Sequence, residues 1–516
     1  MAIPLQKIRL SLKEHKQETI ISTTPCNWSR NSFFPGVVGR GSARKSLVTT
    51  KVVPKNDSPI RVSDSERMKA KEGDEERVAL TKEPKRKLAD AWREIHGQND
   101  WAGMLDPLDP LLRAELMRYG DMAQACYDAY EFDPYSKYCG SCKVKPSMFF
   151  ENLGWNKCGY EVTSYIYSTY NVNFPKFFNV SLNPDGWSHS ANWIGYVAVS
   201  NEEYSKYLGR RDIMIAWRGT VTNAEKIADL MDFQNPTTYH TIPSRDPTIK
   251  VEAGFLDLYA GRNVDCQYCK YSAREQVLAE VKRLKELYPG EELSITITGH
   301  SLGSALATLN AYDIAEIGLD VMEDGRVIPV TVFSFSGPRV GNARFKERLE
   351  GLGVKILRIF NVHDQVPKVP GIFLNELVPK VLQQLGGWLP WCYFHVGEEL
   401  PLNHENSPFL KDESNLVFFH NLEVLLHLLD GYHGKGRRFW LAGGRDIALV
   451  NKTTDFLKRD FLIPPNWWET NNRMLFKNHL GQWVMPEQHD LEIHTPSEDV
   501  QHHLQQLNLA CHAQWH

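Results

Sequence analysis

The sequence has no long apolar run and carries little net charge, and both absences narrow the class of protein. No run of about 18 or more apolar residues occurs in its 516 residues, so no segment is expected to span a bilayer as a helix. The formal net charge of −4 at pH 7 gives no electrostatic case for binding nucleic acid. Apolar residues make up 42% of the chain and charged residues 24%, which is typical of a globular protein.

Cysteine is also scarce. The nine cysteines are an odd number, spread thinly along the chain, and do not match the framework of a small disulfide-stabilised domain. Two pairs have CxxC spacing, Cys139 with Cys142 and Cys266 with Cys269, and four thiolates could in principle bind zinc. These pairs lie far beyond zinc-ribbon spacing from each other, so we expect reduced thiols or disulfides, and neither a metal nor a cofactor.

The first 60 residues differ in composition from the rest of the chain. They hold ten basic and three acidic residues, are rich in Ser and Thr, and lack the apolar core of a secretory signal. This composition predicts an organelle transit peptide, of plastid rather than mitochondrial type, with a disordered cytosolic tail as the alternative. Residues 61–88 are predicted to be a charged linker, residues 89–475 the main folded domain, and residues 476–516 a C-terminal tail.

One short stretch lies between two contrasting patterns. Residues 293–298 alternate like a buried strand, and residues 302–315 carry Ala and Leu at helical spacing. Between them, residues 299–303 read Gly-His-Ser-Leu-Gly. The pattern Gly-X-Ser-X-Gly is weak alone, but a strand before it and a helix after it are the context of a nucleophile elbow.

Each residue of this elbow has an expected role. Gly299 and Gly303 leave room where the strand and the helix approach each other, and His300 lies between Gly299 and Ser301. The sharp turn holds Ser301 in a strained conformation with its hydroxyl exposed, so we predict Ser301 as a nucleophile. The backbone N–H of Leu302, at the positive end of the helix, is predicted to stabilise an oxyanion. The alternative is an ordinary tight turn.

Strand-like and helical patterns alternate through the middle of the chain. Such alternation predicts an α/β fold with a mainly parallel sheet, in the style of the α/β-hydrolases, with helices before it in the chain. Catalytic groups in these folds lie at the carboxyl ends of strands. The predicted strands are 193–200, 212–217, 293–298, 327–334 and 354–361, and the predicted helices are 273–287, 302–317 and 343–352.

Residues that follow two of these strands have further expected roles. Arg218, Gly219 and Thr220 follow the strand 212–217, and Thr220 is predicted to supply the second half of an oxyanion hole. The next run, residues 221–231, has one apolar side and is predicted to be a helical lid, with a surface helix as the alternative.

An acid and a base are expected after the nucleophile. Asp364 follows the strand 354–361 on a loop, where an acid that orients a histidine belongs, whereas His363 is interpreted as structural. The base must follow the acid in the chain if the order is Ser, Asp, His. Five histidines qualify; His420, at the start of a helical pattern, is our first choice, and the alternatives include His427 and His395. The remaining two are His404 and His433.

The motifs together resemble those of the class 3 lipases, and more narrowly the plastid-targeted members of the plant phospholipase A1 family. The resemblance covers roughly residues 88–475. It rests on Ala-Trp-Arg-Gly-Thr at 216–220, Gly-His-Ser-Leu-Gly at 299–303, Phe-Ser-Gly-Pro-Arg-Val-Gly-Asn at 335–342, Asn-Val-His-Asp-Gln-Val-Pro at 361–367 and His-Asn-Leu-Glu at 420–423.

The resemblance implies an activity as well as a fold. It implies Ser301, Asp364 and His420 as a catalytic triad, with Thr220 and Leu302 around the oxyanion. It further implies hydrolysis of sn-1 acyl esters of phospholipids, galactolipids or triacylglycerol, with a link to free linolenate and jasmonate synthesis. The expected location is the plastid, peripheral to membranes or plastoglobules. One departure is an apolar insertion at 376–391, which could touch membrane or shape the acyl site.

The expected mechanism is that of a serine hydrolase. The histidine takes the proton of the serine as it attacks the ester, the aspartate holds the imidazole in the right tautomer, and water cleaves the acyl-enzyme. Two alternatives share the scaffold: a non-catalytic lipase-like protein that binds signalling partners, and an acyltransferase in which an alcohol replaces water.

Overall fold

The architecture was determined from a computed structural model of the chain. The structure describes residues 86–133, 138–155, 157–169, 191–220, 246–264, 270–370, 392–412 and 415–468, together with 234–236, 242, 244, 476–477 and 483–484. The predicted transit peptide, the lid at 221–231 and the insertion at 376–391 lie outside the described residues, as do Cys266, Cys269 and nearly all of the predicted linker and tail.

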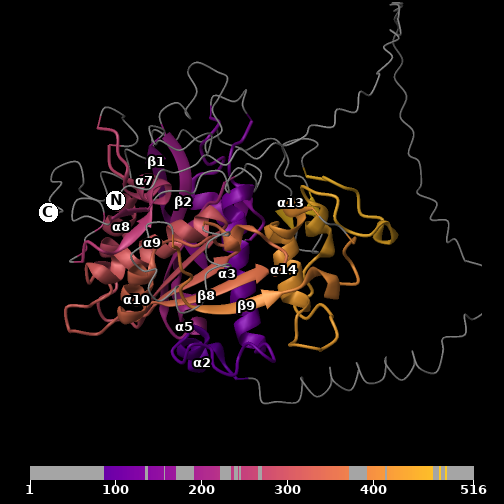
Figure 1. The fold of residues 1–516 in the computed structure, drawn as a ribbon, viewed down its shortest axis with the longest axis horizontal. Helices are drawn as coiled ribbons and strands as arrows, with labels where there is room; N and C mark the ends of the chain where they lie inside the picture. Colours follow the sequence, from indigo (N-terminus) through magenta and orange to yellow (C-terminus); the bar gives the residue numbers. More distant parts are fainter. Residues whose placement is uncertain are drawn as a thin grey trace, which may run out of the picture. The chain divides into compact units, whose positions relative to one another are not determined.

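A seven-stranded sheet forms the centre of the described part (Figure 1). The strand order is β1-β2-β3-β6-β7-β8-β9. β1, β2 and β3 pair antiparallel, and β3, β6, β7, β8 and β9 pair parallel. The strands are β1 Tyr160–Thr169, β2 Ala191–Ser200, β3 Arg211–Trp217, β6 Leu293–His300, β7 Val330–Phe335, β8 Lys355–Asn361 and β9 Glu398–Leu402; the short β4 Gln234–Pro236 pairs with β5 Lys250–Glu252, and β10 Phe476–Lys477 with β11 Trp483–Val484.

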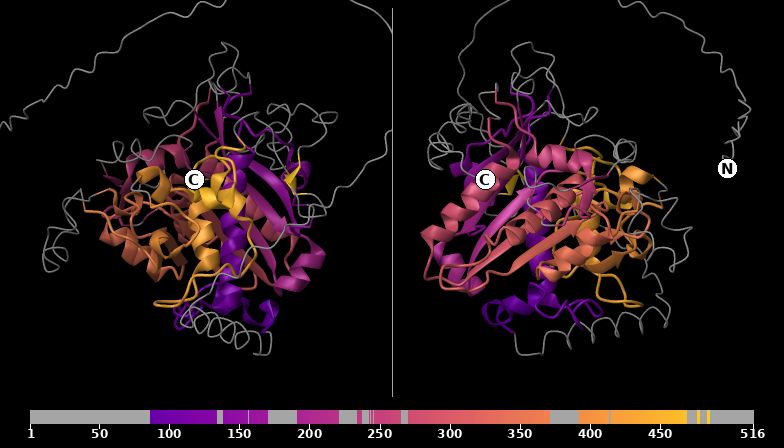
Figure 2. Two further views of the ribbon diagram at one scale, coloured as in Figure 1. Left: turned by 90° about the vertical axis from the view of Figure 1, so that its right-hand side faces the viewer. Right: turned by 60° about the vertical axis from the view of Figure 1, so that its left-hand side comes forward.

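Helices cover both faces of this sheet (Figure 2). Together with the mostly parallel sheet they form the α/β-hydrolase fold that the sequence predicts, with α2 and α3 as the helices that precede it. No helix among the described residues combines the length and the apolar character needed to cross a membrane. The α-helices are α2 Leu88–Ile95, α3 Pro110–Asp128, α4 Phe149–Asn152, α5 Glu202–Leu208, α7 Ala253–Ala260, α8 Ala273–Leu287, α9 Leu302–Glu316, α10 Ala343–Gly351, α13 Leu416–Phe419 and α14 Leu422–Gly431.

Two separate hydrophobic cores follow from the alternation of side chains along the strands. In β3, Met214 and Ala216 join the core that contains α3 and α14, whereas Ile213 and Ile215 join the core that contains α7, α8 and α9. One apolar side of α3 is buried in the first of these cores; its residues are Leu112, Leu116, Tyr119, Met122 and Ala123. The sheet is therefore covered on both sides, which explains why its inner strands are apolar on both faces.

A buried carboxylate attaches α3 to the sheet. Asp212 in β3 accepts hydrogen bonds from the hydroxyls of Tyr119 in α3 (2.9 Å), Ser294 (2.6 Å) and Thr296 in β6 (2.6 Å). Thr298, two residues farther along β6 and on the same face, donates to the backbone carbonyl of Tyr119 at 3.1 Å. Because each buried polar group has a partner, the position of α3 against β6 is fixed by directional contacts as well as by packing.

Candidate active site

The serine of the predicted elbow lies at the junction of β6 and α9. Ser301 has φ 59° and ψ −128°, a conformation that a residue with a side chain rarely adopts. Its backbone N–H donates to the carbonyl of Phe335 at 2.9 Å, and the hydroxyl of Ser304 donates to the carbonyl of Gly299 at 2.6 Å. The strain at Ser301 is thus held by hydrogen bonds on both sides of the turn.

The glycines of the elbow permit a close approach of backbones. A Cβ on Gly303 would lie 2.2 Å from the carbonyl oxygen of Trp217 at the end of β3. A Cβ on Gly299 would lie 2.3 Å from the backbone carbon of Gly303. Both distances are far below a possible contact. A larger residue at either position would therefore push the first turn of α9 away from β3 or β6.

The structure brings the predicted acid and base together. Asp364 follows β8, and its Oδ2 lies 2.8 Å from Nδ1 of His420. Its other oxygen accepts from the backbone N–H of Val366 at 2.9 Å, which holds the carboxylate in place. His420 lies between α13 and α14, where Asn421 caps α14 by accepting from the N–H of Val424 at 3.0 Å. The cap fixes where the helix starts and therefore where His420 lies.

Burial and hydrogen-bonding capacity single out two atoms of this site. Ser301, Asp364 and His420 are 1%, 2% and 8% exposed. Oγ of Ser301 and Nε2 of His420 are both buried, and neither forms a hydrogen bond with any described residue, including each other. Buried polar atoms without partners are uncommon in proteins and concentrate where a ligand or a reaction uses them.

The predicted oxyanion loop lies against the serine. A Cβ on Gly219 would lie 3.3 Å from Cβ of Ser301. Arg218 fixes the loop from behind: its Nε donates to the carbonyl of Trp193 and its Nη1 to that of Gly219, both at 3.0 Å. Thr220 comes next in the chain, and Leu302 begins α9 on the other side of Ser301. Gly219, which precedes Thr220, and Leu302 therefore both lie next to Ser301.

The other histidines have partners elsewhere. His427 faces the hydroxyl of Ser407 across 2.8 Å in the middle of α14, and His395 faces the carbonyl of Pro367. His395 belongs to no strand, and its neighbour Phe394 forms only an isolated bridge. His433 stacks on a tryptophan ring, and His404 packs against His363 and Phe419.

Neither cysteine of the described CxxC pair is in a disulfide. Both Cys139 and Cys142 are buried. Within the ranges that the structure describes, no group of three or more His, Cys, Asp or Glu side chains could hold a metal ion.

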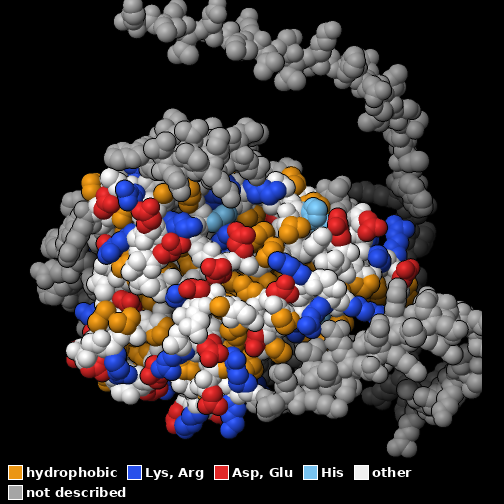
Figure 3. Space-filling view, turned by 60° about the horizontal axis from the view of Figure 1, so that its bottom comes forward, with side chains coloured by type: hydrophobic (Ala, Val, Ile, Leu, Met, Phe, Trp, Pro, Cys, Tyr) orange, Lys and Arg blue, Asp and Glu red, His pale blue; other side chains and the backbone are white. Residues whose placement is uncertain are grey.

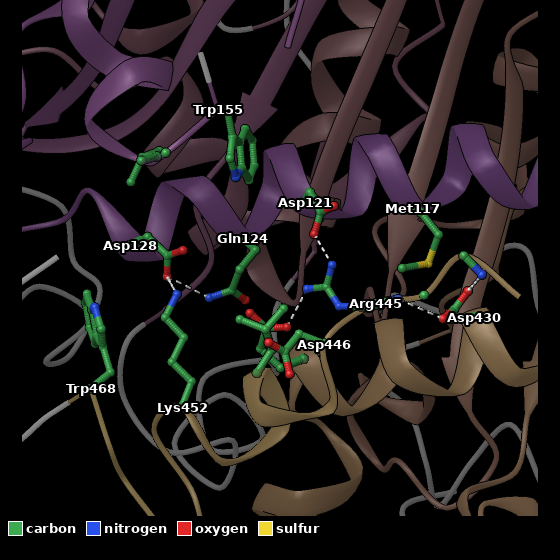
Figure 4. A pocket seen from close by; sticks show the side chains of 16 residues that line it. Met117, Asp121, Gln124, Asp128, Trp155, Asp430, Arg445, Asp446, Lys452 and Trp468 are labelled. Atoms are coloured by element: carbon green, nitrogen blue, oxygen red, sulfur yellow. Dashed lines mark hydrogen bonds and ion pairs between the residues drawn. The ribbon is translucent and has the colours of Figure 1, made fainter. Parts of the chain in front are cut away.

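A cavity of about 360 Å³ is lined by residues of α3, α14 and the segment 443–452 (Figure 4). Arg445 crosses it and pairs with Asp121 of α3 and Glu423 of α14, three residues after His420. Lys452 pairs with Asp128 at 2.6 Å. Burial alone would lower the pKa of Arg445, but the carboxylates of Asp121 and Glu423 raise this pKa overall. The ion pairs that line the cavity thus connect α14 and the segment 443–452 to α3.

Tyr127 is a neighbour of the site for which the sequence gives no signal. It belongs to the last turn of α3, and its hydroxyl lies 2.8 Å from Nδ1 of His300. A tyrosine near the end of an amphipathic helix is indistinguishable in sequence from a core residue, because the contact joins positions 173 residues apart.

Comparisons with known proteins agree with these motifs. The class 3 lipase family model, Lipase (class 3), matches residues 214–374. The chain is 57% identical over 437 residues to "Phospholipase A1-Igamma1, chloroplastic" of Arabidopsis thaliana, covering 83% of this chain and 84% of the relative. It is 45% identical over 350 residues to "Galactolipase DONGLE, chloroplastic" of the same plant, covering 66% and 70%. Both relatives are named chloroplastic, which supports the plastid localisation predicted from the sequence.

Among solved structures the chain is similar to the triacylglyceride lipase of Rhizomucor miehei, at 20% identity and a TM-score of 0.35, over 56% of this chain and 79% of that chain. The family rests instead on the sequence relatives, which are similar over most of both chains. The chain belongs to the plant phospholipase A1 family of class 3 lipases, and it is a lipase-type carboxylic ester hydrolase.

Proposed function

We propose that this enzyme hydrolyses the sn-1 acyl ester of membrane glycerolipids through Ser301, Asp364 and His420. The observation that carries the proposal is the buried contact of His420 Nδ1 with Asp364, which leaves Nε2 of His420 and Oγ of Ser301 as buried atoms without partners. An imidazole held at Nδ1 by a carboxylate has Nε2 available as a base, and a serine hydroxyl needs such a base to become a nucleophile.

In the proposed mechanism, Nε2 of His420 takes the proton of Ser301 as its oxygen attacks the ester carbonyl. The N–H groups near Thr220 and Leu302 stabilise the oxyanion, each by about 3 kcal/mol. The protonated His420 then gives its proton to the leaving alcohol, which departs as a lysolipid. Water attacks the acyl-enzyme with His420 again as base, and releases the free fatty acid.

The substrate class is supported by the relatives. Their printed names include phospholipase A1 and galactolipase, so phosphatidylcholine and galactolipids are the substrates to test, with triacylglycerol as a third. We propose that the enzyme meets these lipids from the membrane surface. We further propose residues 1–60 as the transit peptide and residues 221–231 as the lid.

The test uses the full chain on vesicles of phosphatidylcholine or monogalactosyldiacylglycerol, each labelled separately at sn-1 and at sn-2. Release of sn-1 fatty acid by the wild type, lost in Ser301→Ala, is the expected result. Release from sn-2 alone would contradict the proposed position. Equal inactivity of wild type and variant would instead favour the non-catalytic scaffold, and transfer of the label to an added alcohol in preference to water would favour an acyltransferase.

A further inference from the structure

Two hydrogen bonds connect α3 to the backbone of the proposed base through the histidine of the elbow. The hydroxyl of Tyr127 lies 2.8 Å from Nδ1 of His300, and Nε2 of His300 lies 2.8 Å from the backbone carbonyl of His420. A carbonyl can only accept, so Nε2 of His300 carries the proton. Nδ1 is then the acceptor, and the Tyr127 hydroxyl donates to it. The contacts therefore select one tautomer of His300.

The oxyanion loop joins the same chain of contacts. A Cβ on Gly219 would lie 2.3 Å from the hydroxyl oxygen of Tyr127 and 2.5 Å from the backbone oxygen of His300. The Tyr127 hydroxyl therefore lies directly against the backbone of Gly219. This one hydroxyl thus contacts the loop that carries Thr220 and the residue that precedes Ser301.

Both side chains are held neutral. Burial lowers the pKa of His300 well below its usual value, and the neighbouring His420 ring, 4.7 Å away between centroids, lowers it further. Burial raises the pKa of the Tyr127 hydroxyl, against the opposing effect of Arg218. With both groups neutral, the direction of each hydrogen bond stays fixed, and His300 adds no positive charge beside the base.

We propose that Tyr127 and His300 are positioning residues, which set the backbone of His420 and the loop of Gly219 relative to Ser301. The proposal rests on the proposed triad. Neither residue contacts the reacting atoms. Removing the Tyr127 hydroxyl would leave Nδ1 of His300 without this partner and would open space beside Gly219, so the imidazole and the loop would shift. Such a shift misaligns base and oxyanion donors in the transition state and leaves substrate binding largely intact.

The test is Tyr127→Phe in the full chain, assayed on a water-soluble p-nitrophenyl ester. We expect kcat to fall by about tenfold or more while KM stays within about twofold. Tyr196→Phe is the matched control, because its buried hydroxyl donates to the carbonyl of Met122 on the same helix at 2.9 Å but contacts none of the site residues. Its kcat is expected to stay within about twofold, with a thermal midpoint as low as that of Tyr127→Phe.

A second pair of variants tests the role of His300. A glutamine amide can replace Nε2–H as donor to the His420 carbonyl, so His300→Gln should keep more of kcat than His300→Leu. Equal losses of kcat in Tyr127→Phe and Tyr196→Phe, or a loss confined to KM, would overturn the proposal. Failure of the proposed function itself is seen separately, because the wild type would then hydrolyse the ester no faster than Ser301→Ala.

Discussion

At the scale of single residues, His420 and His427, the two histidines of the α14 region, differ in their hydrogen-bond partners. His420 has a carboxylate at Nδ1 and no partner among described residues at Nε2, whereas His427 is buried against the Ser407 hydroxyl. Burial, with a smaller effect of Arg445, lowers the pKa of His427 to about 3. A base must gain a proton during turnover, and His427 is placed where a proton is disfavoured.

We predict that His427→Gln keeps activity and removes part of the acid sensitivity of the fold. Folded His427 stays neutral below pH 6.5 while unfolded His427 takes up a proton, so the wild type loses stability as pH falls from about 6.5 toward 3. At pH 5 the loss relative to the variant is about 2 kcal/mol. Urea unfolding at pH 7.5 and pH 5 measures it. Parallel pH curves, or loss of ester hydrolysis in the variant, would show that His427 has another role.

Local geometry was predictable where close packing imposes a sequence pattern. Ser301 stands in a motif whose glycines are required by distances of 2.2 and 2.3 Å, so the elbow can be recognised from five residues together with the strand before them and the helix after them. His420 could only be ranked above other histidines, because its contact with Asp364 spans 56 residues. Tyr127 has a contact of the same kind but no motif around it, so only the structure shows it.

At the scale of elements, α14, which begins two residues after His420, is held by a buried ion-pair network. Arg445 has a side chain only 12% exposed and pairs with two carboxylates on different helices. Burial raises the pKa of Glu423 against the opposing effect of Arg445, so this carboxylate needs the cation to stay ionised. The cost of removing Arg445 is large, because Glu423, whose side chain is only 6% exposed, remains buried without this cation.

We predict that Arg445→Met destabilises the fold by about 3–5 kcal/mol. The matched control is Arg344→Met on α10, whose pair with Glu347 has both side chains more than half exposed and should change stability by less than about 1 kcal/mol. Chemical denaturation of both variants makes the comparison. Similar small effects would mean that the cavity in Figure 4 admits enough water to solvate the two carboxylates.

Element boundaries were predictable for inner strands and failed at the edges of the sheet. The five predicted strands all exist, although β7 begins at Val330 rather than 327, because Val327 forms an isolated bridge with Val321. β1 and β9 were not predicted, and they are the two edge strands. Edge strands carry charged residues, such as Glu161 in β1 and Glu398 and Glu399 in β9, and tolerate proline, such as Pro401 in β9; both hide the strand signal. α8 was predicted to the residue, because Ser272 and Glu275 form a capping box.

At the scale of the whole molecule, the surface offers no dominant charge on the face in Figure 3. Basic and acidic side chains are interspersed there over the described residues. This distribution agrees with a formal net charge of −4 in 516 residues. Long-range steering toward a substrate of one charge is therefore not a feature of this face.

α2 is the first element of the described residues, and this gives the prediction at the scale of the chain. α2 buries Leu88, Trp92 and Ile95 against the core, and the following residue, His96, lies 2.6 Å from Nη2 of Arg210. The chain divides into the units Met1–Ala70 and Lys71–His516. We therefore expect a chain starting at residue 86 to keep the thermal midpoint and the kcat for a soluble ester.

A chain starting at residue 98 should behave differently, because it lacks α2. Each of the three large apolar side chains contributes about 1.5–3 kcal/mol by burial, so their joint loss approaches the whole stability of a typical domain. We expect this shorter chain to be insoluble or to unfold far below the wild type, whereas the chain starting at 86 serves as its matched control. Equal thermal midpoints for the two truncated chains would mean that α2 is dispensable. In that case the folded domain would begin at α3, whose start is fixed by the Asp109 cap and its hydrogen bonds to the N–H groups of Leu111 and Leu112.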